Sequence, residues 1–217
     1  NNWERAVYFT SISDIKNVLG IDKYLHQEGL VHRFIPVEAD YYYKNSGGVY
    51  VEGSYDLLMN KVNWGNINDP DVTLDPETRR NILYAKQSYL RLAQALQEQG
   101  KNDSAVKVID KCLEFFPDDK MAFDFYMMYY PDLYYKAGAT DKGDNLVNTI
   151  VTNALDNINY YDSLKPRFKK YYTESIRENL ALINQMYDIT SKNKRTELSN
   201  ELQSILNEKI TMFYDIL

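Results

Sequence analysis

The sequence is short of the residues that most often build metal sites and disulfides. It has 217 residues but one cysteine, Cys112, and two histidines, His26 and His32. A single cysteine excludes an intrachain disulfide and a zinc site made of several cysteines. The two histidines lie on either side of a glycine and a predicted strand start, which is not the spacing of a metal pair, so we expect each to be structural or on the surface. We therefore predict no metal ion, no other cofactor and no catalytic residue.

Long hydrophobic runs and an excess of basic charge are also lacking. No stretch approaches the ~18 uncharged apolar residues that a transmembrane helix needs. The chain does not open with the basic and apolar pattern of a signal peptide. Its first residues, "NNWERAVYF", look like the interior of a domain, so we expect a piece of a longer protein. The net charge of −6 argues against a nucleic-acid partner, because phosphate binding needs a basic patch.

The pattern that is present changes from mixed to helical near residue 53. Residues 6–12 and 30–37 carry β-branched and aromatic residues typical of strands, whereas residues 13–29 show helical spacing. From Ser54 onward the helical period dominates, and Ser54 has the chemistry of an N-cap. We therefore predict a small mixed α/β region at 1–53 and a helical repeat domain at 54–217.

Prolines and glycines divide the helical part into segments. Asp75 followed by Pro76 is typical of an N-cap and first helical position, and Gly100 of a helix end. The predicted helices cover residues 76–99, 102–116, 118–137, 140–161, 166–191 and 194–217. The third is expected to kink at Pro131, because proline removes one backbone hydrogen bond.

The first helical pair matches the 34-residue tetratricopeptide signature, which alternates large and small residues around a helix crossing. The matching residues are Tyr89, Leu92, Ala93, Leu96, Ala105, Ile109 and Pro117. This best repeat spans 86–119, and an ordinary helical hairpin is the alternative. A degenerate repeat at 120–161 carries Phe123, Tyr126, Met127 and Tyr130, with its glycine stop about one turn late. Helices within 165–217 are expected to cap the apolar end of a solenoid.

The first helix of each tetratricopeptide pair lines the concave face, which predicts an interaction surface. Its residues are Gln87, Leu90, Gln94, Gln97, Met128, Asp132 and Tyr135. This face is rich in amides and aromatic rings, and it suits a protein, a peptide or a glycan better than a strongly charged ligand. The tyrosine clusters at 40–44, 123–135 and 169–174 are expected to pack in the core, with a groove for sugar or extended peptide as the alternative.

Several strings together carry a family resemblance. They are "NNWERAVYF", "EGLVHRFIPV", "YDLLMNKVNWGNINDPDVTLDPETRR", "LAQALQEQGKNDSAVKVIDKCLEFFPDD" and "LYYKAG". In this order they resemble, over about residues 1–160, the C-terminal soluble part of a bacterial polytopic membrane-protein family. That family is similar to the eukaryotic protein O-mannosyltransferases, and its members end in tetratricopeptide repeats.

The resemblance implies a non-catalytic function for this chain. The catalytic residues of such glycosyltransferases would lie in a membrane part that this sequence lacks. The chain is therefore expected to be a non-catalytic protein-interaction module on the extracytoplasmic, periplasmic side of a bacterial inner membrane. It would bind an acceptor protein or a partner, and reach the membrane only through missing N-terminal spans. The alternative is a stand-alone periplasmic or surface glycan-binding repeat protein.

Overall fold

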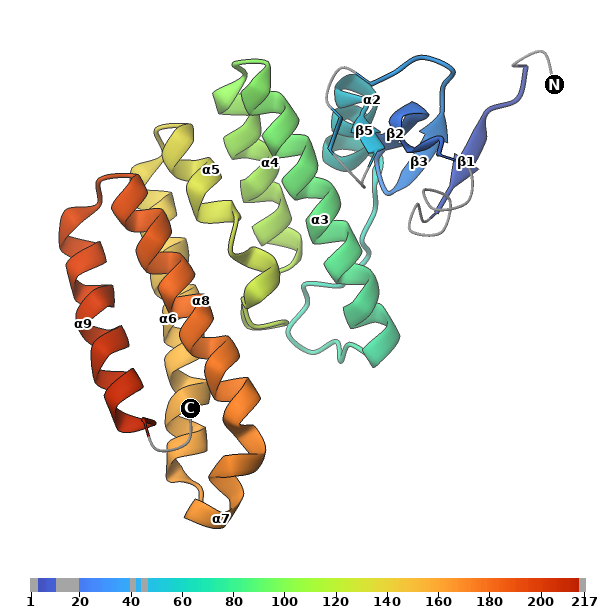
Figure 1. The fold of residues 1–217 in the computed structure, drawn as a ribbon. Coiled ribbons are helices and arrows are strands. Elements are labelled where there is room, and N and C mark those ends of the chain that lie inside the picture. The colour runs from blue at the N-terminus through green and yellow to red at the C-terminus, as the bar shows by residue number, and fades with distance from the viewer. Residues whose placement is uncertain (1–3, 11–19, 40–41, 44–46, 215–217) are drawn as a thin grey trace. The chain divides into compact units, whose positions relative to one another are not determined.

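The computed structural model describes residues 4–10, 20–39, 42–43 and 47–214 (Figure 1). As predicted, the protein is mainly helical, with a small mixed sheet near the N-terminus. No helix in these ranges is long and apolar enough to cross a membrane. The chain divides into two compact units, residues 1–117 and 118–217, which are described separately below. The sheet belongs to the same unit as the first long helices, and the boundary expected after residue 53 stays a prediction.

The N-terminal unit contains a five-stranded sheet in the order β1-β3-β2-β5-β4. Its strands are β1 (Val7–Phe9), β2 (Leu25–Glu28), β3 (Val31–Phe34), β4 (Tyr42–Tyr43) and β5 (Gly47–Val49). The β2–β5 pair is parallel and the other pairs are antiparallel. Strands were expected within 6–12 and 30–37, and β1 and β3 confirm both. The helical interpretation of 13–29 is wrong for 25–28, which form β2, and its residues 13–19 lie outside the described ranges.

A buried arginine joins the sheet to the long helix α3 (Pro76–Glu98). Arg91 Nη2 donates hydrogen bonds to the carbonyls of Gly47 and Gly48, both at 3.1 Å, and Nη1 lies 3.0 Å from His32 Nε2. Gly47 has φ +69°, and a Cβ there would lie 2.5 Å from the carbonyl oxygen of Leu25. Only glycine therefore fits at position 47 of β5, where the backbone carbonyl accepts the hydrogen bond from Arg91.

Ser54 does not begin a helix, contrary to the sequence prediction. Helix α2 (Val51–Asp56) begins three residues earlier, and the π-helical turn η2 (Leu57–Lys61) follows it. Inside α2, the buried hydroxyl of Ser54 donates to the carbonyl of Gln27 at 2.7 Å and accepts from the amide of Gly29 at 3.2 Å. Serine is a preferred N-cap residue, but the Ser54 side chain instead holds the turn of the β2–β3 hairpin against α2.

Helices α3 and α4 (Asn102–Phe115) form the hairpin predicted from the first repeat. Asp75 Oδ1 accepts from the amides of Glu77 at 2.9 Å and Thr78 at 3.1 Å, which confirms the predicted N-cap. The core positions of the signature are all buried, with at most 3 % exposure: Tyr89, Leu92, Ala93, Leu96, Ala105 and Ile109. The hydroxyl of Tyr89 donates to the carbonyl of Leu58 at 2.9 Å, and burial raises the pKa of this phenol to about 12. Trp64 and Phe116 pack around the same ring.

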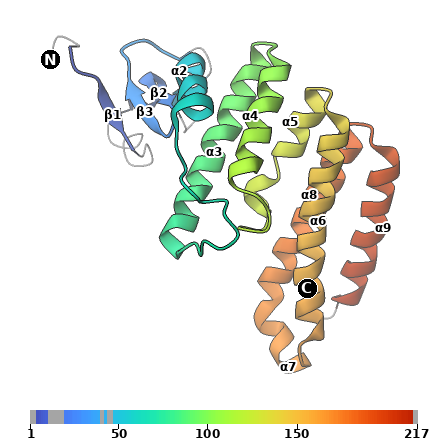
Figure 2. The same cartoon turned by 180° about the vertical axis from the view of Figure 1, so that it is seen from behind.

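The C-terminal unit holds two further helical hairpins. Its elements are the 3-10 turn η3 (Phe125–Met127), α5 (Tyr130–Lys136), α6 (Thr140–Ser163), α7 (Pro166–Lys169), the 3-10 turn η4 (Lys170–Tyr172), α8 (Thr173–Lys192) and α9 (Thr196–Met212). Helix α5 pairs with α6, and α8 packs against both α6 and α9 (Figure 2). The helix predicted at 166–191 is thus divided into α7, η4 and α8, and α9 lies within the helix predicted at 194–217.

The helix predicted over 118–137 is wrong for its first twelve residues, because α5 begins only at Tyr130. Pro131 lies in the first turn of α5, where its missing N–H costs nothing, so it starts a helix instead of kinking one. Upstream, Asp118 Oδ1 accepts from the amide of Phe123 at 2.6 Å and from Asn153 Nδ2 at 2.7 Å. These bonds tie the segment to α6 in a non-helical conformation.

The three helical hairpins turn in the same way. At each turn one residue has positive φ: Gly100 (+72°), Gly138 (+78°) and Lys194 (+60°). In each case its amide bonds the carbonyl three residues earlier, and the next amide bonds the carbonyl five residues before itself, as in a Schellman motif. A small buried residue stands five positions after each: Ala105, Gly143 and Ser199. These features establish repeated helical hairpins, while their identity as a tetratricopeptide solenoid stays a prediction.

Candidate binding site

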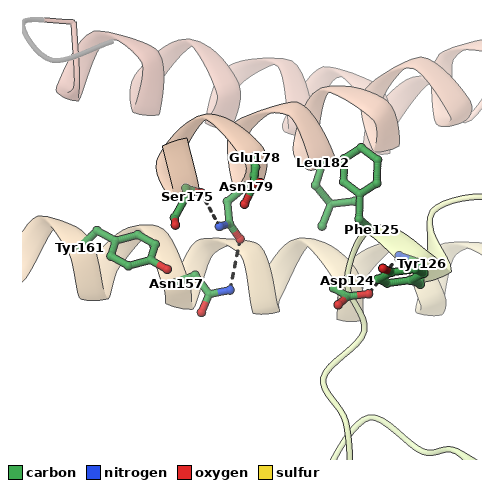
Figure 3. A pocket seen from close by; sticks show the side chains of 9 residues that line it. All are labelled: Asp124, Phe125, Tyr126, Asn157, Tyr161, Ser175, Glu178, Asn179 and Leu182. Atoms are coloured by element: carbon green, nitrogen blue, oxygen red, sulfur yellow. Dashed lines mark hydrogen bonds between the residues drawn. The ribbon is translucent and has the colours of Figure 1, made fainter. Parts of the chain in front are cut away.

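A groove of about 670 Å³ opens on the C-terminal unit. We call it the aromatic–amide groove. Figure 3 shows its lining, which comes from the start of η3, the C-terminal half of α6 and the N-terminal half of α8. The lining residues are Asp124, Phe125, Tyr126, Asn157, Tyr161, Ser175, Glu178, Asn179 and Leu182. Its volume falls within the range of about 300–1,000 Å³ that is common for ligand sites.

The groove exists because α5 is much shorter than its partner α6. At ~1.5 Å per residue, the seven residues of α5 span about 10 Å, whereas the 24 residues of α6 span about 36 Å. Helix α5 can therefore cover only the N-terminal part of α6. Asn157 and Tyr161 lie beyond that cover, and α8 packs along α6 to supply the opposite wall.

Hydrogen bonds fix the polar side chains of the groove. Asn157 Nδ2 donates to Asn179 Oδ1 at 3.2 Å, and Asn179 Nδ2 donates to the carbonyl of Ser175 at 2.7 Å (Figure 3). This chain sets the orientation of both amides before any ligand arrives. Asn153, one turn before Asn157, donates to Asp118 and to the carbonyl of Phe123 at 3.2 Å, so it anchors the segment that leads into η3. The groove is therefore built by tertiary contacts on several sides.

Aromatic rings form the apolar part of the same groove. Phe125 is 49 % exposed and Tyr126 is 55 % exposed, which is unusual for side chains of this size. Tyr161 stacks on Tyr172 with ring centroids 5.0 Å apart and an interplanar angle of 23°. Exposed rings beside fixed amides can stack on a flat ligand and hydrogen-bond its edges.

The charge of the groove is acidic. Asp124 and Glu178 are both exposed at its wall, and the carboxylate of Asp124 also accepts from the amide of Tyr126 at 3.0 Å. Over the part of the chain that the structure describes, no group of three or more His, Cys, Asp or Glu side chains is placed to hold a metal ion. The arrangement can therefore bind a neutral or basic polar ligand through amides, carboxylates and ring faces.

None of the seven residues predicted for the interaction surface lines this groove. Four lie on α3 in the N-terminal unit: Gln87 is exposed, Gln94 and Gln97 are partly exposed, and Leu90 is only 9 % exposed. The other three lie in the C-terminal unit, where Met128 is also only 9 % exposed. Burial leaves Leu90 and Met128 little surface to offer a ligand.

The last two predicted residues bind other parts of their own unit. Asp132 accepts from Asn193 Nδ2 at 2.9 Å and pairs with Lys136 Nζ at 2.7 Å. The hydroxyl of Tyr135 donates to Asp144 Oδ1 at 2.8 Å, and Arg195 Nε donates to the same oxygen at 3.0 Å. These contacts connect α5 and α6 to the turn between α8 and α9. The available signal for the groove was the tyrosine-rich string at 123–135, which holds Phe125 and Tyr126.

Comparison with known protein families finds a match at the N-terminal end. Residues 1–52 match the family model of TMEM260-associated domain 2, a domain associated with a membrane-protein family. This covers 52 of the 217 residues. No curated protein matches the chain. No solved structure matches it either. The comparisons thus support a link to a membrane-protein family at the N-terminal end, and the finer resemblance to O-mannosyltransferases stays a proposal.

Proposed function

We propose that this chain is a non-catalytic, polypeptide-binding module of a larger membrane protein resembling a glycosyltransferase. The module stands on the extracytoplasmic side of a bacterial inner membrane, and its three hairpins are diverged tetratricopeptide units. The match of residues 1–52 to a domain associated with a membrane-protein family supports the link to a membrane protein. The shared turns and small crossing residues of the hairpins support the diverged tetratricopeptide units.

The aromatic–amide groove is the observation that carries the binding role. An extended polypeptide presents one N–H and one C=O per residue, which the fixed amides of Asn157 and Asn179 can match. The exposed rings of Phe125 and Tyr126 offer contact for its side chains. Because the groove is acidic at Asp124 and Glu178, the favoured segment is neutral or basic.

A peptide selection tests this function. The whole chain is presented with a random library of 12-residue peptides, and the enriched peptides are labelled and titrated by fluorescence anisotropy. Tyr126→Ala should weaken binding about tenfold or more, since buried aromatic anchors dominate such interfaces. Tyr84→Ala is the matched control, because Tyr84 is 62 % exposed and lies on α3 in the other unit. Selected peptides that bind both variants and the unchanged chain equally would remove the groove from the function.

Glycan binding is the second candidate, and the stacked pair Tyr161–Tyr172 beside the amides favours it. Sugar rings stack on aromatic faces, and their hydroxyls pair with amides and carboxylates. Isothermal titration against a panel of oligosaccharides decides: heats that disappear in Tyr161→Ala would support this candidate, and flat heats throughout would exclude it.

The size of the native protein separates a module from a stand-alone binder. An antibody against this chain should detect a membrane-bound band far above 25.4 kDa if the chain belongs to a larger membrane protein. A band near 25.4 kDa in the soluble fraction would contradict the proposed parent protein and favour a stand-alone periplasmic or surface binder.

A further inference from the structure

Residues 165–172, "KPRFKKYY", form a basic and aromatic segment in an otherwise acidic chain. We call this segment the basic–aromatic tip. It carries Lys165, Arg167, Lys169 and Lys170 and no acidic residue, whereas the whole chain has a net charge of −6. Helix α7 and turn η4 make up most of it, and they connect α6 to α8. Figure 1 and Figure 2 both place α7 at the end of the α6–α8 pair, away from the turn between α8 and α9.

The basic side chains of the tip face solvent. Lys165, Arg167 and Lys170 are exposed, and within the described ranges none of the three has a carboxylate within ion-pair distance. Lys169 differs, because its Nζ pairs with Asp162 at 2.5 Å on the last turn of α6. The tip therefore presents three cations that the protein itself does not neutralise in this part of the chain.

Aromatic rings surround these cations. Tyr171 is 76 % exposed, Phe168 is 41 % exposed and Tyr172 is 37 % exposed. The Arg167 guanidinium lies 4.6 Å from the centroid of the Phe168 ring, and Lys170 Nζ lies 5.9 Å from that of Tyr171. Tyr172 stacks on Tyr161, but the rings of Phe168 and Tyr171 are too exposed to serve the core of their own unit, so the tip keeps apolar and cationic surface available together.

This combination has a specific physical preference. Tyrosine and phenylalanine enter the boundary between headgroups and acyl chains, while nearby lysine and arginine side chains stay with anionic headgroups. Each basic residue close to an anionic bilayer strengthens binding about fivefold. A short convex helical turn also meets a flat surface more fully than it meets an extended acidic peptide or a nucleic acid, which need a groove or a basic stripe.

We infer that the basic–aromatic tip docks on the surface of an anionic lipid bilayer. The tip lies beside the aromatic–amide groove, since Tyr161 of the groove stacks on Tyr172 of the tip. Docking would therefore hold the groove close to the membrane surface. This inference stands on the charge and exposure of the tip and does not depend on what the groove binds.

Vesicle sedimentation with the whole chain tests the docking. Vesicles of phosphatidylcholine with about a third of phosphatidylglycerol should bind the chain, and vesicles of phosphatidylcholine alone should bind it at least tenfold more weakly. Raising the salt from about 0.1 M to about 0.5 M should release it, because exposed charges are screened. Circular dichroism of each variant checks that it is folded.

Charge-matched variants identify the surface responsible. Lys165→Gln, Arg167→Gln and Lys170→Gln together should lower the partition coefficient about 100-fold. The control removes the same charge at three other exposed lysines, Lys101→Gln, Lys107→Gln and Lys192→Gln, and should retain most of the binding.

Three results would overturn the docking. One is equal binding to the two kinds of vesicle, and another is an equal loss in the two triple variants. The third is competition by free glycerol phosphate at millimolar concentration, which would show a phosphate site instead of a bilayer surface.

Discussion

Replacing Gly143 with alanine should destabilise the C-terminal unit, although alanine is the better helix former. Gly143 is buried in the first turn of α6, where α6 packs against α5. A Cβ at this position would lie 2.5 Å from Cε1 and 2.8 Å from Cδ1 of the Tyr135 ring. Carbon atoms in proteins essentially never approach a Cβ within 3.0 Å, so the ring has to move.

The ring of Tyr135 is not free to move without cost. Its hydroxyl donates to Asp144 at 2.8 Å, and Asp144 also accepts from Arg195 Nε at 3.0 Å. Alanine gains about 0.5–1 kcal/mol over glycine in a helix. Overpacking costs about 1–3 kcal/mol, and loss of a hydrogen bond to a charged group costs a further ~1.5–3 kcal/mol. The expected net result is a loss of about 1.5–5.5 kcal/mol in the free energy of unfolding.

Urea denaturation followed by far-UV circular dichroism measures this loss, and hydrogen exchange should place it in α5 and α6. The decisive control is the same substitution in a Tyr135→Ala background. There the ring is absent, so Gly143→Ala should stabilise by about 0.5–1 kcal/mol through helix propensity alone. If Gly143→Ala stabilises the unchanged chain, or has the same sign in both backgrounds, contact with the Tyr135 ring is not the reason for glycine here.

The first hairpin could be predicted from the sequence because its signals are local. Periodic apolar residues, the Asp75–Pro76 start and the Gly100 stop all lie within α3, α4 and their turn, and each is confirmed. The second hairpin could be placed only in part. Its glycine stop, Gly138, lies 38 residues after Gly100, and its crossing residue, Gly143, lies 38 residues after Ala105. Because the signature repeat is 34 residues long, the difference agrees with the expected insertion of about one turn.

The missed features depend on partners far along the chain. The segment before α5 has helical spacing, yet Asp118 binds Asn153, which is 35 positions away. The third hairpin lacked a recognisable stop, because Lys194 adopts the left-handed conformation that glycine usually takes. Strand β2 carries the polar residues of "LHQE", and only its pairing with β3 and β5 identifies it as a strand.

The candidate groove follows from these missed features. Its walls require a short α5, a long α6 and an α8 that packs beside it, and the sequence predicted only the second of these. The tyrosine cluster at 123–135 was expected to pack in the core, with a groove as the alternative, but Phe125 and Tyr126 are exposed. Which rings are exposed depends on where α5 begins, and that start is set by Pro131 together with the tertiary contacts of Asp118.

Three further substitutions test the packing of the hairpins. Tyr89→Phe removes the buried hydrogen bond to Leu58 and should cost about 1 kcal/mol, measured by urea denaturation. For Asp144, burial raises the pKa, but hydrogen bonds led by Arg195 lower it more, so the net shift is downward. The ion pair therefore stabilises the fold fully above the ordinary aspartate pKa of about 3.9, and the deficit of Asp144→Asn should disappear as the pH falls through the lowered pKa of Asp144. Lys194→Gly should stabilise by about 0.5–1 kcal/mol, because φ +60° strains any residue with a Cβ. Lys194→Ala removes the same charge but keeps the Cβ, so an equal gain in both variants would show that charge, and not backbone strain, limits this turn.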